Sequence, residues 1–391
     1  ATKSMFYGPI AKLPDAVSAA DKVRLTTAYQ QAITTELVPA YQKLSVFLKN
    51  EYLPQARTTS GYGALPGGPA AYRYAVKAAT TTTKTPDEIY QTGLSEVRRL
   101  RTEMERVKKE VGFLGDLPAF FAYMKNEPKF RPYKTPQEVL DGFEAIHQRM
   151  LPNLSKLFGR TPKTPFEIRQ TEAYRAASAS AQYVAGSPDG SRAGIFYVPI
   201  LDATQYNVTT LPPMEDVFLH EAIPGHHYQI SLQNENTALP KFRRFGGYSA
   251  FSEGWALYCE SLGKELGLYT DPYQYVGSLG GEMHRAIRLV VDVGLHAKGL
   301  TREEAIQYMM DNEVITEQLA TAEIERYMGN PGQALSYKTG QLKILEWRAR
   351  YEKQLGPKFD LRAFHDELLA GGAMPLAVAE RRMDAWAARP R

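Results

Sequence analysis

A helical repeat of apolar residues runs through most of this 391-residue chain and constrains its fold more than any other feature. In eight segments we expect a helix that buries one face, because apolar residues recur there at spacings of three and four. Thr85-Pro86 and Thr135-Pro136 open two of them, and a capping threonine followed by proline is typical of a helix start. The sequence therefore predicts a mainly α-helical fold. The segments are residues 20–49, 86–112, 136–157, 214–223, 249–266, 277–297, 302–312 and 335–354.

Residues 180–213 depart from this pattern. Asp189-Gly190 is a strong turn signal, and Ile195 to Ile200 is a run of branched and aromatic residues typical of a strand. We expect a small β-sheet directly before the segment 214–223. Such a sheet can be a stabilising hairpin, or it can offer an edge strand along which an extended peptide pairs. The sequence leaves both interpretations open.

The length of the chain predicts two lobes, because it exceeds what one hydrophobic core usually organises. We place a helical lobe at residues 1–180. A second lobe at residues 181–391 contains the small sheet, the segment after it and the C-terminal helices. We expect the two lobes to form one continuous structural unit.

Composition excludes several classes of protein. The net charge is only +4 and the positive residues are scattered, so we expect no nucleic-acid partner. Cys259 is the single cysteine, which rules out an internal disulfide and a thiolate metal cluster. No stretch reaches the roughly 18 to 20 apolar residues that a transmembrane helix needs. The N-terminus does not read as a signal peptide and has no initiator methionine, so we expect a mature or trimmed chain and leave its compartment open.

The stretch HEAIPGHH at residues 220–227 begins like the zinc-peptidase signature H-E-x-x-H. Its fifth position is proline, and we interpret the Pro-Gly pair at 224–225 as a two-residue insertion that bulges the helix. His220 then supplies one zinc ligand and His226 the second, with His227 as the alternative second ligand. Glu221 would act as a base toward a metal-activated water and pass the proton to the leaving amine. The competing interpretation is a helix end with surface histidines.

A third ligand must come from another segment, because catalytic zinc keeps three protein ligands and one water. The best candidate is Glu253 in SAFSEGWALY, since a carboxylate among apolar and aromatic neighbours is costly to bury without a partner. Glu260 lies two turns further on the same face and could orient a ligand histidine from behind. Glu253 could instead be an exposed residue of an amphipathic helix.

Two further stretches carry polar groups at helical spacing. Arg288, Asp292 and His296 recur every four positions on an otherwise apolar helix. They form either an internal ion-pair network or a clamp for a substrate carboxylate. Tyr327 and Tyr337 in RYMGNPGQALSYKTGQ could donate to the oxyanion of a tetrahedral intermediate. We assign Tyr337 to this catalytic role and Tyr327 to substrate binding.

Six motifs together resemble the bacterial domain-of-unknown-function family 885, over residues from about 5 to the C-terminus. The resemblance implies a multi-helix zinc-peptidase fold similar to the thimet-oligopeptidase-like gluzincins, with a channel between two helical lobes. Family members are labelled lipoproteins or metallopeptidase-like proteins, and many have export signals and a further N-terminal helical region. This implies an exported protein, periplasmic or lipid-anchored. Because this chain lacks both segments, we expect it to be a fragment or one piece of a processed enzyme. The motifs are GYGALPGGPAAYRY, DGSRAGIFYV, HEAIPGHHYQ, SEGWALY, RLVVDVGLHAKG and NPGQALSYKTGQ.

The leading hypothesis is a zinc-dependent metallopeptidase that hydrolyses short peptides. The alternatives are a zinc amidase acting on a non-peptide amide, and a non-catalytic metal-binding or scaffold protein. Glu221 distinguishes the enzymes from the scaffold, because a scaffold needs no proton shuttle beside its ligands. The sequence does not decide between zinc, manganese and cobalt, and it sets neither peptide length nor oligomeric state.

Overall fold

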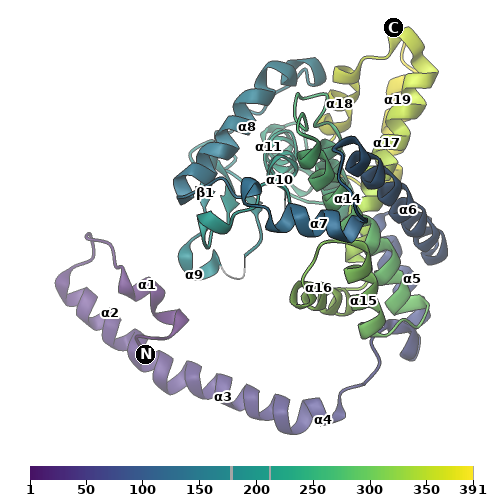
Figure 1. Ribbon diagram of the computed structural model, residues 1–391. Coiled ribbons are helices and arrows are strands. Elements are labelled where there is room, and N and C mark those ends of the chain that lie inside the picture. The colour runs from purple at the N-terminus through teal and green to yellow at the C-terminus, as the bar shows by residue number, and fades with distance from the viewer. Residues whose placement is uncertain (177–178, 211–212, 391) are drawn as a thin grey trace. The chain divides into compact units, whose positions relative to one another are not determined.

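A computed structural model describes residues 1–176, 179–210 and 213–390 (Figure 1). The chain forms two compact units, Ala1–Thr59 and Ser60–Arg391. The expected mainly helical fold with one small sheet is confirmed. The expected lobe boundary between residues 180 and 181 lies inside the second unit, and a division there stays a prediction.

The first unit is helical. It begins with α1 (Gly8–Ala11), followed by α2 (Ala19–Ala32), α3 (Val38–Phe47) and α4 (Leu53–Gln55). Two π-helical turns, Ile33–Leu37 and Leu48–Tyr52, join the last three helices. The helix predicted over residues 20–49 is therefore present, and it continues to Gln55.

The second unit contains the remaining helices. They include the other seven predicted segments. The first half comprises α5 (Gly68–Thr80), α6 (Pro86–Glu110), α7 (Leu117–Asn126), α8 (Pro136–Leu157), α9 (Ala173–Ala176), α10 (Met214–Glu221), α11 (His226–Glu235) and α12 (Lys241–Arg244). The second half comprises α13 (Ser249–Ser261), α14 (Pro272–Ala297), α15 (Arg302–Asn312), α16 (Glu317–Gly329), α17 (Ser336–Leu355), α18 (Leu361–Ala370) and α19 (Leu376–Ala387).

The predicted helix starts at Thr85 and Thr135 are confirmed. The Thr85 hydroxyl accepts the amide hydrogen of Glu88 at 3.2 Å, and the Glu88 carboxylate accepts that of Thr85 at 2.7 Å. Thr135 caps α8 in the same way, with the amide of Glu138 as donor. These contacts satisfy amide groups that have no partner within the first turn of a helix.

Apolar side chains of the second unit gather in distinct clusters. The largest packs α8, α10, α13 and α17–α19 around the small sheet, with Trp255 and Trp347 fully buried. Another lies between α6, α7, α14, α15 and α16. A smaller cluster joins α5 to α6 and α14. α14 contributes to the last two clusters and packs along α6, so it is a central helix of this unit (Figure 1).

The small sheet has three strands in the order β1-β3-β2. β1 (Phe166–Gln170) runs parallel to β3 (Gly194–Val198), and β2 (Gln182–Val184) pairs with β3 in the antiparallel sense. The predicted strand is β3, which ends two residues earlier than expected. β2 is an edge strand, and its register sets Tyr183 opposite Phe196. In the chain, the short 3-10 helix Ala203–Gln205 lies between β3 and α10.

None of the helices in the described part of the chain combines the length and the apolar character that crossing a membrane requires.

Candidate metal centre

The segment HEAIPGHH folds as two helices with a break between them. α10 ends at Glu221, and α11 begins at His226. Pro224 has no amide hydrogen to continue a helix. A Cβ atom on Gly225 would lie 1.9 Å from the carbonyl oxygen of His220, so the chain makes this approach only with glycine. The bulge expected within one helix is therefore corrected to a complete break.

The break brings two imidazoles and a carboxylate together. The Nε2 atoms of His220 and His226 lie 3.5 Å and 3.4 Å from Oε2 of Glu253, which projects from α13. One donor atom from each of the three residues lies within 4.8 Å of the others. Ligands arranged tetrahedrally at about 2.0 to 2.1 Å from a zinc ion stand about 3.3 to 3.4 Å apart. The two histidine-to-glutamate distances match this separation, and the three donor atoms lie close enough together to hold one metal ion.

Glu260 is hydrogen-bonded to the ring nitrogen of His220 that points away from Glu253. Its Oε1 atom lies 2.7 Å from Nδ1 of His220, and both side chains are buried. A hydrogen bond at Nδ1 turns Nε2 of the same ring toward Glu253. A carboxylate in this position fixes the orientation of a ligand histidine and raises its basicity.

The electrostatic environment of the three donors favours a cation. Burial alone would lower the pKa of His220, yet its contacts with Glu253 and Glu260 raise that pKa to about 10. Burial acts to raise the pKa of Glu253, but the imidazoles of His226 and His220 outweigh it and hold the pKa well below its usual range. The carboxylates that stabilise a proton on His220 would also stabilise a metal ion.

His227 lies outside this group. Its Nδ1 atom is 3.1 Å from the Tyr183 hydroxyl, and its ring packs against Phe166 with 4.8 Å between the ring centroids. Burial lowers the pKa of His227 to about 4, with a smaller contribution from His147. The structure thus groups His226, and not His227, with His220 and Glu253.

Glu221 lies between the three donors and the sheet. Its Oε2 atom accepts the amide hydrogen of Tyr183 on β2 at 2.8 Å. Its negative charge also raises the pKa of His220, although less than Glu253 and Glu260 do. The neighbouring edge strand therefore fixes one oxygen of the carboxylate that the sequence suggests as a base.

α13 and α17 cross at a pair of glycines. A Cβ atom on Gly254 would meet the Cα of Gly340 at 2.5 Å, and one on Gly340 would meet the carbonyl oxygen of Ala250 at 1.9 Å. Glu253 directly precedes Gly254, and Tyr337 lies one turn before Gly340. The close crossing therefore sets the half-buried Tyr337 in the neighbourhood of Glu253. The Tyr337 hydroxyl lies 3.5 Å from Nε2 of Gln333, at the limit of a hydrogen bond.

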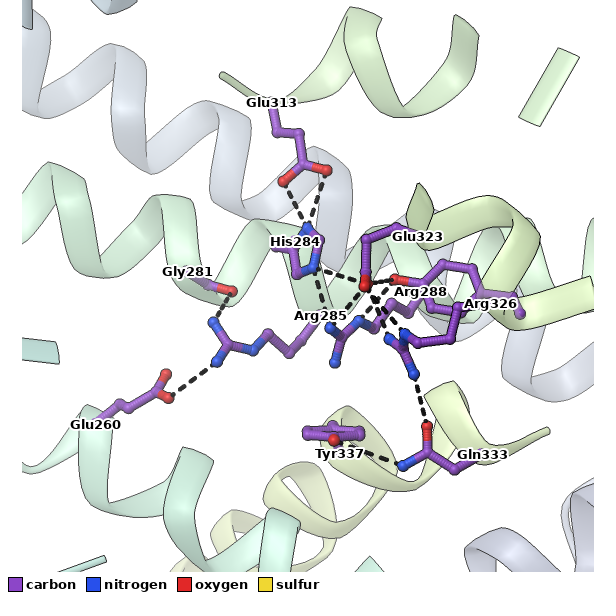
Figure 2. A network of polar contacts seen from close by, with 11 residues as sticks. Glu260, Gly281, His284, Arg285, Arg288, Glu313, Glu323, Arg326, Gln333 and Tyr337 are labelled. Carbon is purple, nitrogen blue, oxygen red and sulfur yellow. Dashed lines mark hydrogen bonds and ion pairs between the residues drawn. The ribbon is translucent and has the colours of Figure 1, made fainter. Parts of the chain in front are cut away.

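Arg288 and Tyr327 belong to a polar network between α14 and α16 (Figure 2). Nε of Arg288 donates to the Tyr327 hydroxyl at 2.9 Å, and Nη2 donates to Glu323 at 3.1 Å. The Arg288 guanidinium also lies over the ring of Tyr337, 4.7 Å from its centroid. This ring contact connects the network with the α13–α17 crossing.

Asp292 and His296 lie on the same helix as Arg288 but have other partners. Asp292 accepts hydrogen bonds from the Tyr72 hydroxyl at 2.6 Å and from the amide of Gly332. The ring nitrogens of His296, which is fully buried, lie 3.1 Å from the amide of Tyr62 and from the carbonyl of Tyr327. The structure does not bring His296 to the metal centre, and the hydrogen bonds of Arg288 and Asp292 go to different partners.

Several residues of the network escaped the sequence analysis. His284, one turn before Arg288, lies 2.8 Å from Glu313 through Nδ1 and 3.1 Å from Nη2 of Arg288 through Nε2. Glu323 and Arg326 complete it on α16. Helical spacing was the signal on each helix, four residues between His284 and Arg288 and three between Glu323 and Arg326, but the sequence could not show that the two helices meet.

Comparison with known proteins shows the family. The model of the family described as "Bacterial protein of unknown function (DUF885)" matches residues 1–383. The chain belongs to this family. No curated protein sequence matches this DUF885 chain.

Solved structures share the fold. The crystal structure of a "putative lipoprotein" from Colwellia psychrerythraea is 36% identical, with a TM-score of 0.92. That match covers 98% of the DUF885 chain and 66% of the other protein's length, so this chain spans slightly less than two thirds of that protein. A "putative lipoprotein of unknown function" from Shewanella oneidensis has a TM-score of 0.72 at 22% identity, with coverages of 96% and 69%. The second match shows the fold alone.

Proposed function

We propose that this chain is a zinc-dependent metallopeptidase that hydrolyses short peptides. The observation that carries the proposal is the convergence of His220, His226 and Glu253 at spacings suited to zinc, beside Glu221. Two imidazole nitrogens and a carboxylate oxygen form a donor set that catalytic zinc sites use, and this set leaves a fourth position open. Glu260 supplies the carboxylate that such histidines commonly have behind them.

The chemistry follows from the side chains around this set. A zinc ion held there would supply a Lewis acid that polarises a peptide carbonyl and acidifies a water molecule. Glu221 would accept the proton of the attacking water and deliver it to the leaving amine nitrogen. Its hydrogen bond with the Tyr183 amide holds one carboxylate oxygen and so orients the other. The Tyr337 hydroxyl would donate to the oxyanion that forms at the carbonyl.

The sheet supports a peptide as the substrate. β2 is an edge strand, and an extended peptide can pair with such a strand through main-chain hydrogen bonds. Because Tyr183 of β2 contacts Glu221, a peptide paired there would pass beside the proposed base. The lipoprotein label of the Colwellia relative supports an exported, lipid-anchored location for this protein.

Glu221→Gln tests the proposal, because it preserves the shape of the side chain and removes the base. We expect the variant to bind zinc as the wild type does, while turnover of short peptides falls by roughly 100-fold or more. Elemental analysis and a screen of short peptides, with and without a chelator, measure both properties. Unchanged turnover in the variant would remove Glu221 from the mechanism, and a wild type that cleaves no peptide would contradict the peptidase assignment.

A further inference from the structure

The guanidinium of Arg288 is buried, yet it is only partly satisfied. Tyr327 and Glu323 occupy Nε and Nη2, whereas Nη1 is fully buried and has no hydrogen-bond partner. Buried polar groups in native proteins are nearly always hydrogen-bonded, so an unpaired charged donor calls for an explanation. On the preceding turn of α14, Nε of Arg285 is also buried without a partner.

The contacts of Arg288 fix its orientation. Glu323, its ion-pair partner, is bound at the same time by Arg326 and by the Tyr327 hydroxyl. His284, which lies against Nη2 of Arg288, is itself tied to Glu313. Two arginines therefore share the carboxylate of Glu323, and the free nitrogen of Arg288 is held in a fixed orientation. Figure 2 shows His284, Arg288 and Arg326 converging on the carboxylate of Glu323.

Two contacts connect Arg288 with the residues around the candidate metal centre. The Tyr337 ring lies under its guanidinium, and α17, which carries Tyr337, crosses α13 beside Glu253. One turn earlier on α14, Arg285 lies 3.7 Å from Glu260, the carboxylate behind His220. This face of α14 therefore extends from Glu260, the hydrogen-bond partner of the proposed ligand His220, to the free nitrogen of Arg288.

We propose that Arg288 binds the terminal carboxylate of the peptide, so that the substrates are short peptides with a free C-terminus. This inference rests on the proposed peptidase function and names the end of the substrate that the site recognises. An arginine nitrogen with two free hydrogens forms charge-assisted hydrogen bonds with a carboxylate and repels an amino terminus. Because Nη1 is buried, the side chains that cover it must move for the carboxylate to reach it.

The test compares binding of one N-acetylated tetrapeptide, as the free acid and as the carboxamide, to the full chain carrying Glu221→Gln. This background keeps the peptides intact during calorimetry. We expect the acid to bind about 10-fold tighter or more, the scale of a hydrogen bond between charged groups. Arg288→Lys should remove most of this preference. Arg326→Lys is the matched control, because Arg326 also binds Glu323 but all its nitrogens have partners, and it should keep the preference.

Arg288→Gln is a second variant in case the lysine variant does not fold, and it should abolish the preference. An unchanged acid-to-amide ratio in either Arg288 variant would overturn the inference. So would equal binding, or no binding, of the two peptides in the parent protein. Hydrolysis by the wild type is measured separately. A carboxylate preference that depends on Arg288 without any hydrolysis would support the clamp and contradict the peptidase assignment.

Discussion

At the scale of single residues, two buried histidines of this protein have pKa values shifted in opposite directions. His220 and His365 are both buried, but His220 faces two carboxylates whereas His365 faces neutral groups. Nδ1 of His365 is 2.8 Å from the carbonyl of Leu157, and Nε2 is 2.7 Å from the Tyr258 hydroxyl. A neutral ring satisfies both contacts by donating to the carbonyl and accepting from the hydroxyl. The surroundings therefore favour a cation at His220 and a neutral ring at His365.

His365 should make the protein less stable in acid. Burial lowers its pKa to about 3, whereas an unfolded histidine titrates near pH 6.5. Between these values the unfolded chain binds one more proton, so the free energy of unfolding falls as the pH is lowered through this window. His365→Gln keeps a donor and an acceptor but does not titrate. Relative to this variant, the wild type should lose roughly 1.4 kcal/mol for each pH unit below 6.5.

Chemical denaturation of both proteins between pH 7 and pH 4 measures this difference. If the stability difference between wild type and His365→Gln stays constant over that range, His365 does not carry the effect.

At the scale of elements, glycine controls how closely the helices of the centre approach. Gly225 lets the chain turn between α10 and α11, and Gly254 and Gly340 let α13 cross α17 at backbone contact. The position of Glu253 depends on this crossing because Glu253 is the neighbour of Gly254. A side chain at the crossing would have to push the helices apart, since protein interiors are close-packed.

Gly340→Ala should destabilise the protein and disturb the metal centre. The new methyl group would lie 1.9 Å from the Ala250 carbonyl oxygen, so the helices must separate, at a cost of about 1 to 3 kcal/mol. Gly280→Ala is the matched control, because Gly280 also lies within a helix but a Cβ there meets nothing within 4 Å. It should stabilise the chain by about 0.5 to 1 kcal/mol. Melting temperature and zinc affinity report both effects, and equal behaviour of the two variants would contradict the role of the crossing.

Local patterns predicted part of the element map. The long helices α6, α8 and α14 carry strong apolar periodicity and, for the first two, threonine caps, so they were visible in the sequence. The π-helical turns and the parallel pairing of β1 with β3 were not, because they depend on contacts outside each segment. The Pro-Gly pair indicated a distortion, but whether it bulged or broke the helix depended on packing: Trp255 donates to the Pro224 carbonyl at 2.9 Å.

At the scale of the whole second unit, buried ion pairs join helices that are distant in sequence. Lys338 on α17 is fully buried and contacts Glu96 on α6 and Glu282 on α14. Arg99 binds both of these carboxylates from the side of α6. The network fixes α6, α14 and α17 relative to one another, and α14 and α17 carry Arg288 and Tyr337. The contacts that position the residues of the candidate site therefore include ion pairs remote from the proposed metal ligands.

The sequence predicted those residues of the candidate site whose role can be recognised from their immediate neighbours in the chain. His220, Glu221 and His226 lie in one motif, and Glu253 was conspicuous as an acid among apolar neighbours. Arg288 and His296 share a helical face, but Tyr62 and α16 supply their hydrogen-bond partners. Spacing alone could therefore not separate a free donor from a satisfied core histidine.

Zinc content in a pair of histidine variants tests the central claim most directly. The purified wild type should contain one zinc ion per chain, and His226→Ala should lose it because that imidazole belongs to the group formed with His220 and Glu253. His227→Ala alters the adjacent residue, whose ring faces Tyr183 and Phe166, and should retain the metal. Elemental analysis after dialysis against a weak chelator gives the answer. Zinc retained at full stoichiometry by His226→Ala, or lost only by His227→Ala, would contradict the account.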